Sequence, residues 1–584
     1  MKAFVTTISL VLFWTANAAG QGIFRTAQLL ANRSATANCL IVEDNEGNQY
    51  QAITFFDTLK LKNPDQTLAI RDLASRPHGR SGVALMKVDR FGRRRQVQTL
   101  TDSAHSLRAQ SLNWLPGRDL ELAFGAAGAV LRNGVPIANR ASAAGRYLGE
   151  GYLVLDTGLA IRSNYQISFS TAGAFIPNAF GSGPGFFHST GTNITSDTLS
   201  LNGQRFVLPA TIQNRFNSQY TFLATTPKNG GPTRLTYFWS EAGNQGVPYI
   251  NRITYDAEGN QYLVVSAFRT GNVWMNDTII GASRDAGNYI LKLSPSGHLL
   301  WSKLISAKYL LEVTALAPSP LGDKVYLGLS VLGRTVLAGR QFDTDTVVSP
   351  SCPQTYLGLM GALVLDAATG QDLNGMVFNN RPAHYTHQSR LDNIVVLPYG
   401  EVYWGGSIKG NPTLFGGPPV RGWQTLFVAA TGPNLELRWL SLIGGPVDGT
   451  ERQLVSMRYS PYMQELQLVG GLTSWPLATA VGVGNTIVNA TRPALFTAAL
   501  RGLRVTGLGQ AAATLAPYPN PAVAGAFISA GIGGTGPFAL ADAIGRRFAC
   551  TPMPDGRLRL PQVVPGVYTL MGPQGQKARL VIEP

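Results

Sequence analysis

Charged residues, cysteines and long apolar segments are scarce in this chain. Only 14% of its 584 residues are charged, which argues against long exposed helices. Beyond the N-terminal residues, no apolar run is long enough to cross a bilayer as a helix, so we expect a mature protein without a transmembrane helix. The three cysteines, Cys39, Cys352 and Cys550, lie far apart without CxxC spacing, which indicates neither a disulfide framework nor a thiolate zinc site. Buried free thiols are the preferred interpretation, with a Cys39–Cys352 bridge as the alternative.

Motifs for catalysis and cofactor binding are missing or stand in the wrong context. The sequence has no G-x-S-x-G elbow and no Walker loop. Residues 531–536 spell G-x-G-x-x-G, but Pro537 and a strand follow instead of a helix. Carboxylates are few and dispersed, so no glycosidase pair can be selected. The sequence therefore predicts no catalytic residue and no cofactor.

Aspartates that could suggest calcium binding have a simpler explanation. Asp44 and Asp256 each open a turn with further oxygen ligands, but the bidentate Glu that closes an EF-hand loop is missing. Capping of backbone N–H groups by the aspartate explains the same residues. Asp343 and Asp345 carry no stronger signal. A capped turn is therefore preferred over a calcium site.

The only close histidine pair is His384 and His387. Their spacing is one helical turn and would suit zinc, but residues 379–382 before them are typical of a loop. A surface loop is therefore preferred, with zinc as the alternative, and no metal site is predicted.

The abundant residues favour short strands and tight turns. The chain has 65 glycines and 35 prolines, while 45% of its residues are hydrophobic and 9% aromatic, too many for a disordered chain. The net charge of +15, with a basic run at 93–95, could attract acidic glycans, lipopolysaccharide or nucleic acid. We prefer a solvated basic surface without a nucleic-acid partner.

Residues 256–303 form the clearest copy of an internal repeat. A polar turn at 256–260 leads into apolar runs at 262–268 and 289–293, and a turn at 294–297 starts a third run. Short apolar and β-branched runs between turn residues predict strands, and strands buried on both faces lose strict alternation. The turn also occurs earlier, where DNEGNQY at 44–50 matches DAEGNQY at 256–262.

A strand followed by a turn recurs at seven places, which start at residues 85, 153, 222, 291, 363, 427 and 496. The turn glycines at 92, 158, 230, 297 and 370 are separated by 66, 72, 67 and 73 residues. Such an array is typical of propeller blades, although the period exceeds the usual ~40–50 residues. We expect an all-β protein with a seven-bladed β-propeller over about residues 35–510, with six or eight blades as alternatives. The long period predicts long loops, with candidates at 63–79, 180–191 and 342–356.

The repeat also resembles a known family. Its residues Gly259, Asn260, Tyr262, Lys292, Leu293, Gly297 and Trp301 follow the order of the bacterial SBBP-type β-propeller repeat. Residues 256–303 match it well, residues 44–92 moderately and the other copies only in pattern. The resemblance implies a fold and no particular activity.

Tryptophan recurs through the repeats, at Trp239, Trp274, Trp301, Trp404, Trp423, Trp439 and Trp475. We expect most of these side chains to fill the core between blades, while one or two could line a glycan-binding surface.

The two ends of the chain differ from the repeated region. Residues 1–18 combine Lys2, an apolar core at 4–14 and the small residues Ala16 and Ala18, which predicts a signal peptide and its cleavage region. Residues 514–584 break the repeat period and predict a separate small β-sandwich.

This C-terminal segment contains four ordered motifs. They are Tyr518-Pro519-Asn520-Pro521, Asp542-x-x-Gly545-Arg546, Gly566-Val567-Tyr568 and a strand that starts at Lys577. The prolines fix two φ angles and remove two donors, so the first motif is a stiff turn. The order resembles the type A sorting domain of the type IX secretion system (Por secretion) of Bacteroidetes. It departs from that family at Ala516, which stands before Pro517, whereas the family commonly runs straight from leucine into the Tyr-Pro-Asn-Pro turn. The resemblance implies export across the outer membrane, removal of this domain, and release or attachment to surface lipopolysaccharide.

Two functions agree with these features. The preferred one is a non-enzymatic binding or display module, secreted or attached to the outer cell surface, with the type IX machinery as partner and a glycan or surface protein as ligand. The alternative is a secreted polysaccharide hydrolase or lyase. Two carboxylates or a His–Tyr–Arg set meeting in the propeller channel would favour the enzyme.

Overall fold

The computed structural model describes residues 23–501 and 522–583, with internal gaps. The gaps lie at 33–37, 57, 62–70, 75–80, 91–92, 103–106, 116–118, 127–129, 134, 139–148, 171–174, 183–184, 194–197, 202–203, 208–219, 229, 241–246, 268–270, 284–286, 344–358, 379–388, 411, 418–419, 421, 444–450, 461–463, 474–478, 484–485, 491–493, 530–537, 542–546, 554–556 and 572–576. All regular elements among the described residues are strands. The predicted all-β class is confirmed.

The described residues divide into two compact units. The larger unit comes from Met1–Val396 and Val402–Leu503, and the smaller from Arg504–Pro584 with the turn Leu397–Glu401. The predicted boundary near residue 514 lies outside the described residues.

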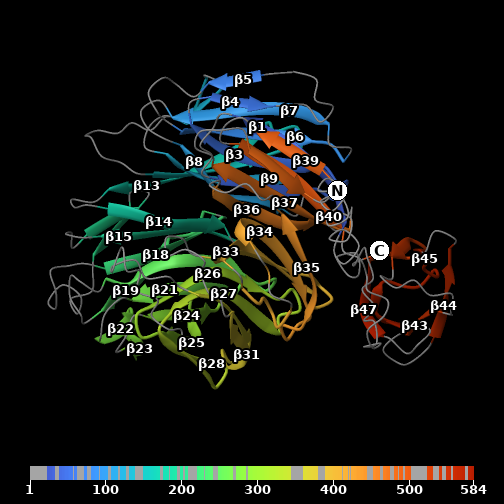
Figure 1. The fold of residues 1–584 in the computed structure, drawn as a ribbon. Coiled ribbons are helices and arrows are strands. Elements are labelled where there is room, and N and C mark those ends of the chain that lie inside the picture. The colour runs from blue at the N-terminus through green and yellow to red at the C-terminus, as the bar shows by residue number, and fades with distance from the viewer. Residues whose placement is uncertain are drawn as a thin grey trace, which may run out of the picture. The chain divides into compact units, whose positions relative to one another are not determined.

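Figure 1 draws the strands of the larger unit from blue to orange. Among its described strands are seven antiparallel sets of four, which pair in the same order from first to fourth strand; we call them sheets 1 to 7, numbered in chain order. From first to fourth strand, sheet 1 contains β2 (Asn38–Glu43), β3 (Gln49–Phe56), β6 (Ser81–Val88) and β7 (Arg94–Asp102). Sheet 2 contains β8 (Arg108–Leu115), β9 (Asp119–Ala126), β12 (Gly149–Leu155) and β13 (Ile161–Ser170). Sheet 3 contains β14 (Phe175–Ser182), β15 (Phe186–Asn193), β18 (Tyr220–Pro227) and β19 (Arg234–Ser240). Sheets 4 and 5 contain β20 (Tyr249–Tyr255), β21 (Gln261–Ala267), β24 (Gly287–Leu293) and β25 (Leu299–Ser306); and β26 (Leu310–Pro318), β27 (Lys324–Leu332), β30 (Leu359–Asp366) and β31 (Asp372–Val377). Sheets 6 and 7 contain β32 (Arg390–Val396), β33 (Val402–Gly410), β34 (Gly422–Thr431) and β35 (Leu437–Ile443); and β36 (Glu451–Ser460), β37 (Glu465–Thr473), β40 (Ala494–Arg501) and β1 (Ile23–Asn32).

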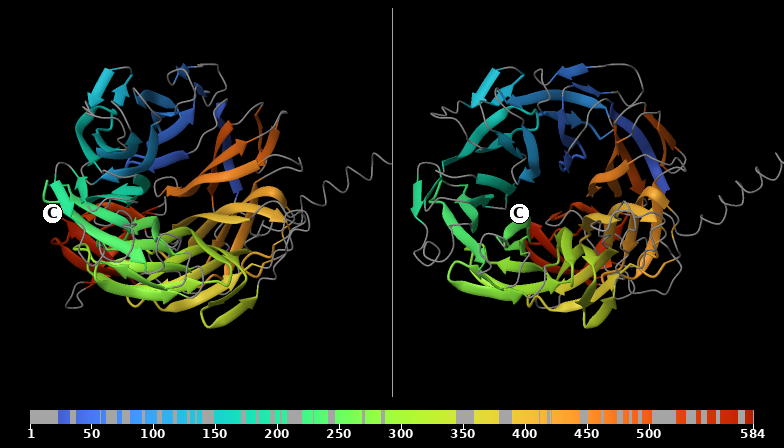
Figure 2. Two further views of the ribbon diagram at one scale, coloured as in Figure 1. Left: turned by 90° about the vertical axis from the view of Figure 1, so that its left-hand side faces the viewer. Right: turned by 60° about the vertical axis from the view of Figure 1, so that its left-hand side comes forward.

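The first strands of the sheets contact one another in chain order. β2 contacts β8, β8 contacts β14, and the series continues through β20, β26 and β32 to β36. β36 in turn contacts β2. Figure 2 shows the sheets following this order from blue to orange. Sheet 7 combines both ends of the larger unit, because β1 pairs with β40 from Ile23↔Arg501 to Asn32↔Ala494. The predicted start at residue 35 therefore omitted a strand.

The seven sequence copies lie on the third strands, one in each sheet. The middle strands are buried on both faces, as predicted: every residue of β21 and β24 is buried, whereas buried and exposed residues mix along the outer strand β25. Apolar clusters fill the space between successive sheets. One cluster joins Val42, Tyr50 and Leu85 of sheet 1 to Leu122 and Leu155 of sheet 2.

The long repeat period has a structural cause, because most sheets carry a hairpin between their second and third strands. These hairpins are β4 (Thr58–Leu61) with β5 (Arg71–Ala74), β10 (Val130–Arg132) with β11 (Val135–Ala138), β16 (Thr198–Leu201) with β17 (Gln204–Val207), β22 (Gly271–Met275) with β23 (Thr278–Ser283), β28 (Arg334–Leu337) with β29 (Arg340–Asp343), and β38 (Thr479–Val483) with β39 (Thr486–Ala490). Four of them pair with the outer strand of the preceding sheet: β10 with β7, β16 with β13, β22 with β19 and β4 with β1. They cover strand edges that would otherwise be open to pairing.

The predicted loop at 180–191 is wrong, because most of it lies in β14 and β15, which pair with each other. The predicted loop at 63–79 contains β5, and the loop at 342–356 begins in β29; their remaining residues lie outside the described part.

The described residues of the smaller unit form seven short strands. They are β41 (Ala522–Val523), β42 (Phe527–Ser529), β43 (Phe538–Ala541), β44 (Arg547–Pro552), β45 (Arg557–Arg559), β46 (Gly566–Met571) and β47 (Lys577–Glu583). Their spatial order is β41-β47-β46-β43-β44-β45-β42. A core of Phe538, Leu540, Cys550, Tyr568 and Leu580 holds them together.

Candidate functional site

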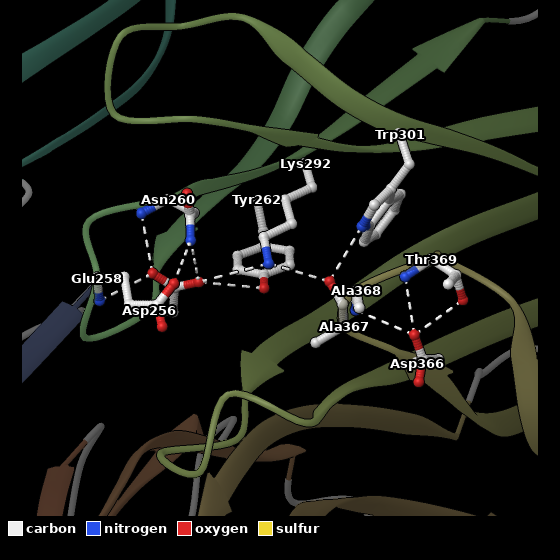
Figure 3. Close-up of polar contacts among 10 residues, drawn as sticks. All are labelled: Asp256, Glu258, Asn260, Tyr262, Lys292, Trp301, Asp366, Ala367, Ala368 and Thr369. Atoms are coloured by element: carbon white, nitrogen blue, oxygen red, sulfur yellow. Dashed lines mark hydrogen bonds and ion pairs between the residues drawn. The ribbon is translucent and has the colours of Figure 1, made fainter.

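The repeated aspartate turn is fully hydrogen-bonded within itself (Figure 3). Oδ1 of Asp256 accepts from the backbone N–H groups of Glu258 at 3.1 Å and Asn260 at 2.8 Å. Oδ2 accepts from Asn260 Nδ2 at 2.9 Å and from the Tyr262 hydroxyl at 3.2 Å. The glycine after Glu258 has φ +82°, which a residue with a side chain rarely adopts.

Asp44 repeats this arrangement. It accepts from the N–H groups of Glu46 at 2.9 Å and Asn48 at 2.8 Å, from Asn48 Nδ2 at 2.8 Å and from the Tyr50 hydroxyl at 3.1 Å. These donors fill the acceptor positions of both carboxylate oxygens. The geometry is that of a capped turn, the interpretation preferred over calcium.

Other repeated residues fasten one sheet to the next. Lys292 on β24 donates to the Ala367 carbonyl at 3.0 Å, and Trp301 on β25 donates Nε1–H to the same oxygen at 3.1 Å (Figure 3). Ala367 belongs to the turn after the third strand of sheet 5. In sheet 1, Lys87 and Tyr50 donate likewise to a carbonyl in the turn of sheet 2, at 2.9 Å and 3.3 Å. The SBBP-like pattern therefore marks joints between sheets.

Most of the tryptophans with described side chains lie in the core. Trp239, Trp301, Trp404 and Trp439 are buried, and Trp274 stacks on Trp239 with ring centroids 5.0 Å apart. The side chains of Trp423 and Trp475 lie outside the described residues.

The remaining sequence candidates that the structure describes show no metal geometry. Asp343 accepts from Arg334 and Gln341, both at 3.0 Å. Asp345, His384, His387 and the glycine run 531–536 lie outside the described residues, within which no group of three or more metal-ligating side chains comes together. Cys39 and Cys550 are buried free thiols, and burial raises their pKa values to about 12 and about 11. Cys352 is not among the described residues.

Of the predicted sorting residues, Gly566, Val567 and Tyr568 lie at the start of β46 and Lys577 starts β47. Tyr568 is buried and donates its hydroxyl to the Val564 carbonyl at 2.8 Å. The others lie outside the described residues, as does the signal region: Tyr518, Pro519, Asn520, Pro521, Asp542, Gly545, Arg546, Ala16 and Ala18.

A feature not predicted from the sequence is a series of register shifts in the first strands. In five sheets one residue of the first strand is skipped in the pairing with the second strand: Gln110, Asn251, Thr314, Asp392 and Val455. A single extra residue in one strand is a β-bulge, which bends the strand and redirects side chains. Four of these five residues are polar, so polar groups are concentrated on the strands that contact one another across the sheets.

Charged side chains gather at the bulges of sheets 4, 5 and 6; we call Arg252, Glu312, Arg390 and Asp392 the charged group. Arg390 lies 3.5 Å from Glu312 (Nη2 to Oε1) and 3.4 Å from Asp392 (Nε to Oδ1). Arg252 donates to the Thr314 carbonyl at 2.8 Å, which joins sheet 4 to the bulge of sheet 5.

The charged group is open to solvent but crowded by protein. The side chains of Arg390, Glu312 and Asp392 are 42%, 37% and 14% exposed, and Arg252 is exposed. Burial raises the pKa of Asp392, an effect that Arg390 and Arg252 partly oppose. Burial also lowers the pKa of Arg252. Partly dehydrated charges make stronger interactions than charges in open water, so a ligand here would meet strong donors and acceptors.

A His–Tyr–Arg set exists around His188, Tyr255 and Arg234, but its histidine is buried. His188 on β15 has no exposed surface, and its ring lies 5.0 Å from that of Tyr255 on β20. Burial lowers the pKa of His188 to about 3, with further contributions from Arg234 and Lys228. A substrate cannot reach a ring without exposed surface, so this set does not meet the expectation for a catalytic site.

No protein-family model matches this chain, and no curated protein matches it either. The described residues contain no helix with the length and apolar character of a membrane span.

Proposed function

We propose that the larger unit is a closed seven-bladed β-propeller and that the protein is an exported binding or display module. The closed ring is supported by the cyclic contacts of the first strands, which return from β36 to β2. It is also supported by β1, which completes sheet 7 from the other end of the chain. Because β1 and β40 come from opposite ends of the larger unit, their pairing would hold the first and last sheets of the ring together and leave no open sheet edge there.

The observation that carries the binding function is the charged group. It places exposed and partly exposed donors and acceptors from three first strands side by side. In a propeller the first strands surround the central axis, where ligands commonly bind. The repeated Asp, Tyr, Lys and Trp residues, by contrast, are occupied in turns and joints between sheets.

Delivery follows from the sequence features at the two ends of the chain. The signal peptide directs the precursor out of the cytoplasm, and the sorting domain directs it through type IX secretion. The mature protein is released or attached to surface lipopolysaccharide. These steps rest on the motifs and their order.

A polysaccharide hydrolase or lyase is the second candidate. One observation favours it: Glu312 and Asp392, on neighbouring first strands, both lie within ion-pair distance of Arg390. A raised pKa suits a general acid, and burial raises that of Asp392. Binding is preferred because two arginines neutralise the two carboxylates.

Two experiments test the proposal. In the native host, deletion of residues 518–584 should leave the truncated protein in the periplasm, while the full chain reaches the surface and loses both ends. Normal surface delivery of the truncated protein, or peptides from 567–579 in the surface form, would contradict the export route. Separately, the purified full chain should bind a cell-surface fraction without releasing reducing sugar. Sugar release that is lost in Asp392→Asn would favour the hydrolase instead.

A further inference from the structure

We infer that the charged group binds the hydroxyl groups of a neutral sugar chain and does not bind a polyanion. This inference rests on the proposed binding function and adds the class of ligand. Three features carry it: the mixture of donors and acceptors, the charge balance, and the loose internal pairing of the group.

The charged group offers both kinds of hydrogen-bonding partner that a sugar hydroxyl needs. A hydroxyl donates one hydrogen bond and accepts others, so it can bridge a carboxylate and a guanidinium. Glu312 and Asp392 supply the acceptors, and Arg252 and Arg390 supply the donors, on three adjacent strands. Hydrogen bonds to charged partners are also stronger than those between neutral groups.

The balance of charge excludes a polyanion as the preferred ligand. The chain as a whole has a net charge of +15. The charged group, however, consists of two arginines and two carboxylates, so the basic surplus lies elsewhere. An acidic glycan or a nucleic acid needs surplus positive charge where it binds, because each anionic group must be neutralised. At the charged group, Glu312 and Asp392 would repel such a ligand.

The internal pairing leaves the group free to exchange partners. Arg390 reaches Glu312 and Asp392 at 3.5 Å and 3.4 Å, which are long for ion pairs, and its buried Nε–H makes no hydrogen bond among the described residues. The pair of Arg390 with Glu312 is the more exposed of the two, and exposed ion pairs contribute little to stability. The short bond from Arg252 to the Thr314 carbonyl is the contact that fastens sheet 4 to sheet 5. Arg390 and the two carboxylates can therefore turn to a ligand without separating the sheets.

Calorimetric titration of the full-length protein tests the inference. The probes are the neutral hexasaccharides of glucose (α- and β-linked), xylose and mannose, and two acidic ones, hexagalacturonate and a heparin hexasaccharide, each at low and high salt. We expect a neutral chain to bind with an affinity that salt hardly changes. Asp392→Asn and Arg390→Met should each weaken it about 10- to 100-fold, the equivalent of one charge-assisted hydrogen bond. Arg334→Met is the matched control, because it removes an exposed ion pair with Asp343 on an outer hairpin.

The outcomes separate this inference from the proposed function. Tightest binding of an acidic probe with steep salt dependence would overturn the ligand class. Neutral-sugar binding that Asp392→Asn, Arg390→Met and Glu312→Gln all leave unchanged would place the site elsewhere. If no hexasaccharide binds but the protein binds a surface protein, the inference fails and the binding function stands. If the sugar binds and is cleaved, the ligand class stands and the binding function gives way to catalysis.

Discussion

His188 makes the larger unit sensitive to acid. Its side chain has no exposed surface, and its Nδ1 lies 3.3 Å from the Thr225 hydroxyl. Burial lowers the pKa of His188 to about 3, whereas an unfolded histidine titrates near 6.5. The folded state therefore keeps the ring neutral over a range in which the unfolded state binds a proton. Its stabilising contribution is complete above pH ~6.5 and is lost as the pH falls towards ~3.

The size of the effect follows from this difference. Where the unfolded state binds one proton more than the folded state, the free energy of unfolding falls by about 1.4 kcal/mol for each unit by which the pH is lowered. From pH ~8 to pH ~4.5, the free energy of unfolding should fall by about 2.5 kcal/mol through His188 alone. Carboxylates with lowered pKa values, such as Asp343 and Asp366, lose their contribution only at lower pH.

The assay is urea unfolding of wild type and His188→Asn at a series of pH values, followed by tryptophan fluorescence. Asparagine can keep the contact with Thr225 but does not titrate. The variant starts less stable, so the measured quantity is the difference in slope, and the wild-type curve should fall more steeply between pH ~6.5 and ~4.5. His298→Asn, at an exposed turn, is the control and should keep the wild-type slope. Parallel curves for wild type and His188→Asn would refute the reasoning.

Three further predictions concern contacts between sheets and the pairing that completes sheet 7. Lys292→Met removes the hydrogen bond to the Ala367 carbonyl and the ion pair with Asp256 at 3.8 Å, and it should lower the free energy of unfolding by about 1–3 kcal/mol in urea titrations. The control Lys308→Met, at an exposed residue, should change it by less than about 0.5 kcal/mol. Burial raises the pKa of Glu43, so its negative charge opposes folding increasingly as the pH rises above ~4.5. Glu43→Gln should therefore gain stability relative to wild type between pH ~4 and ~7. A difference in the free energy of unfolding that stays constant over this range would contradict the prediction. Cysteines in place of Ala27 and Ala498, which are Cα partners of β1 and β40, should form a disulfide detectable by mass spectrometry under oxidising conditions, and failure to form it would argue against the joint in sheet 7.

The part of the fold that depends on neighbouring residues could be predicted from the sequence. Turn residues next to short apolar runs indicated strands, and the repeated motif indicated one strand and turn in each copy, which is the third strand of each sheet in the structure. Asp44 and Asp256 were correctly interpreted as turn caps, because every donor to these carboxylates lies within six residues. The error at residues 180–191 arose because glycine, proline and serine there suggested loops, although β14 and β15 pair through this segment.

The candidate site could not be predicted from the sequence, because it is formed by contacts between residues that lie far apart along the chain. Arg252, Glu312 and Arg390 belong to three different repeats and meet only because the first strands of successive sheets contact one another. The bulges in these strands arise because the pairing between the first and second strands shifts by one residue. The amino-acid composition of the strands does not change markedly at the shift. The place of β1 in sheet 7 likewise depended on its partner β40, at the far end of the larger unit. Local composition determined which segments are strands, whereas long-range pairing decided which strands and side chains lie together.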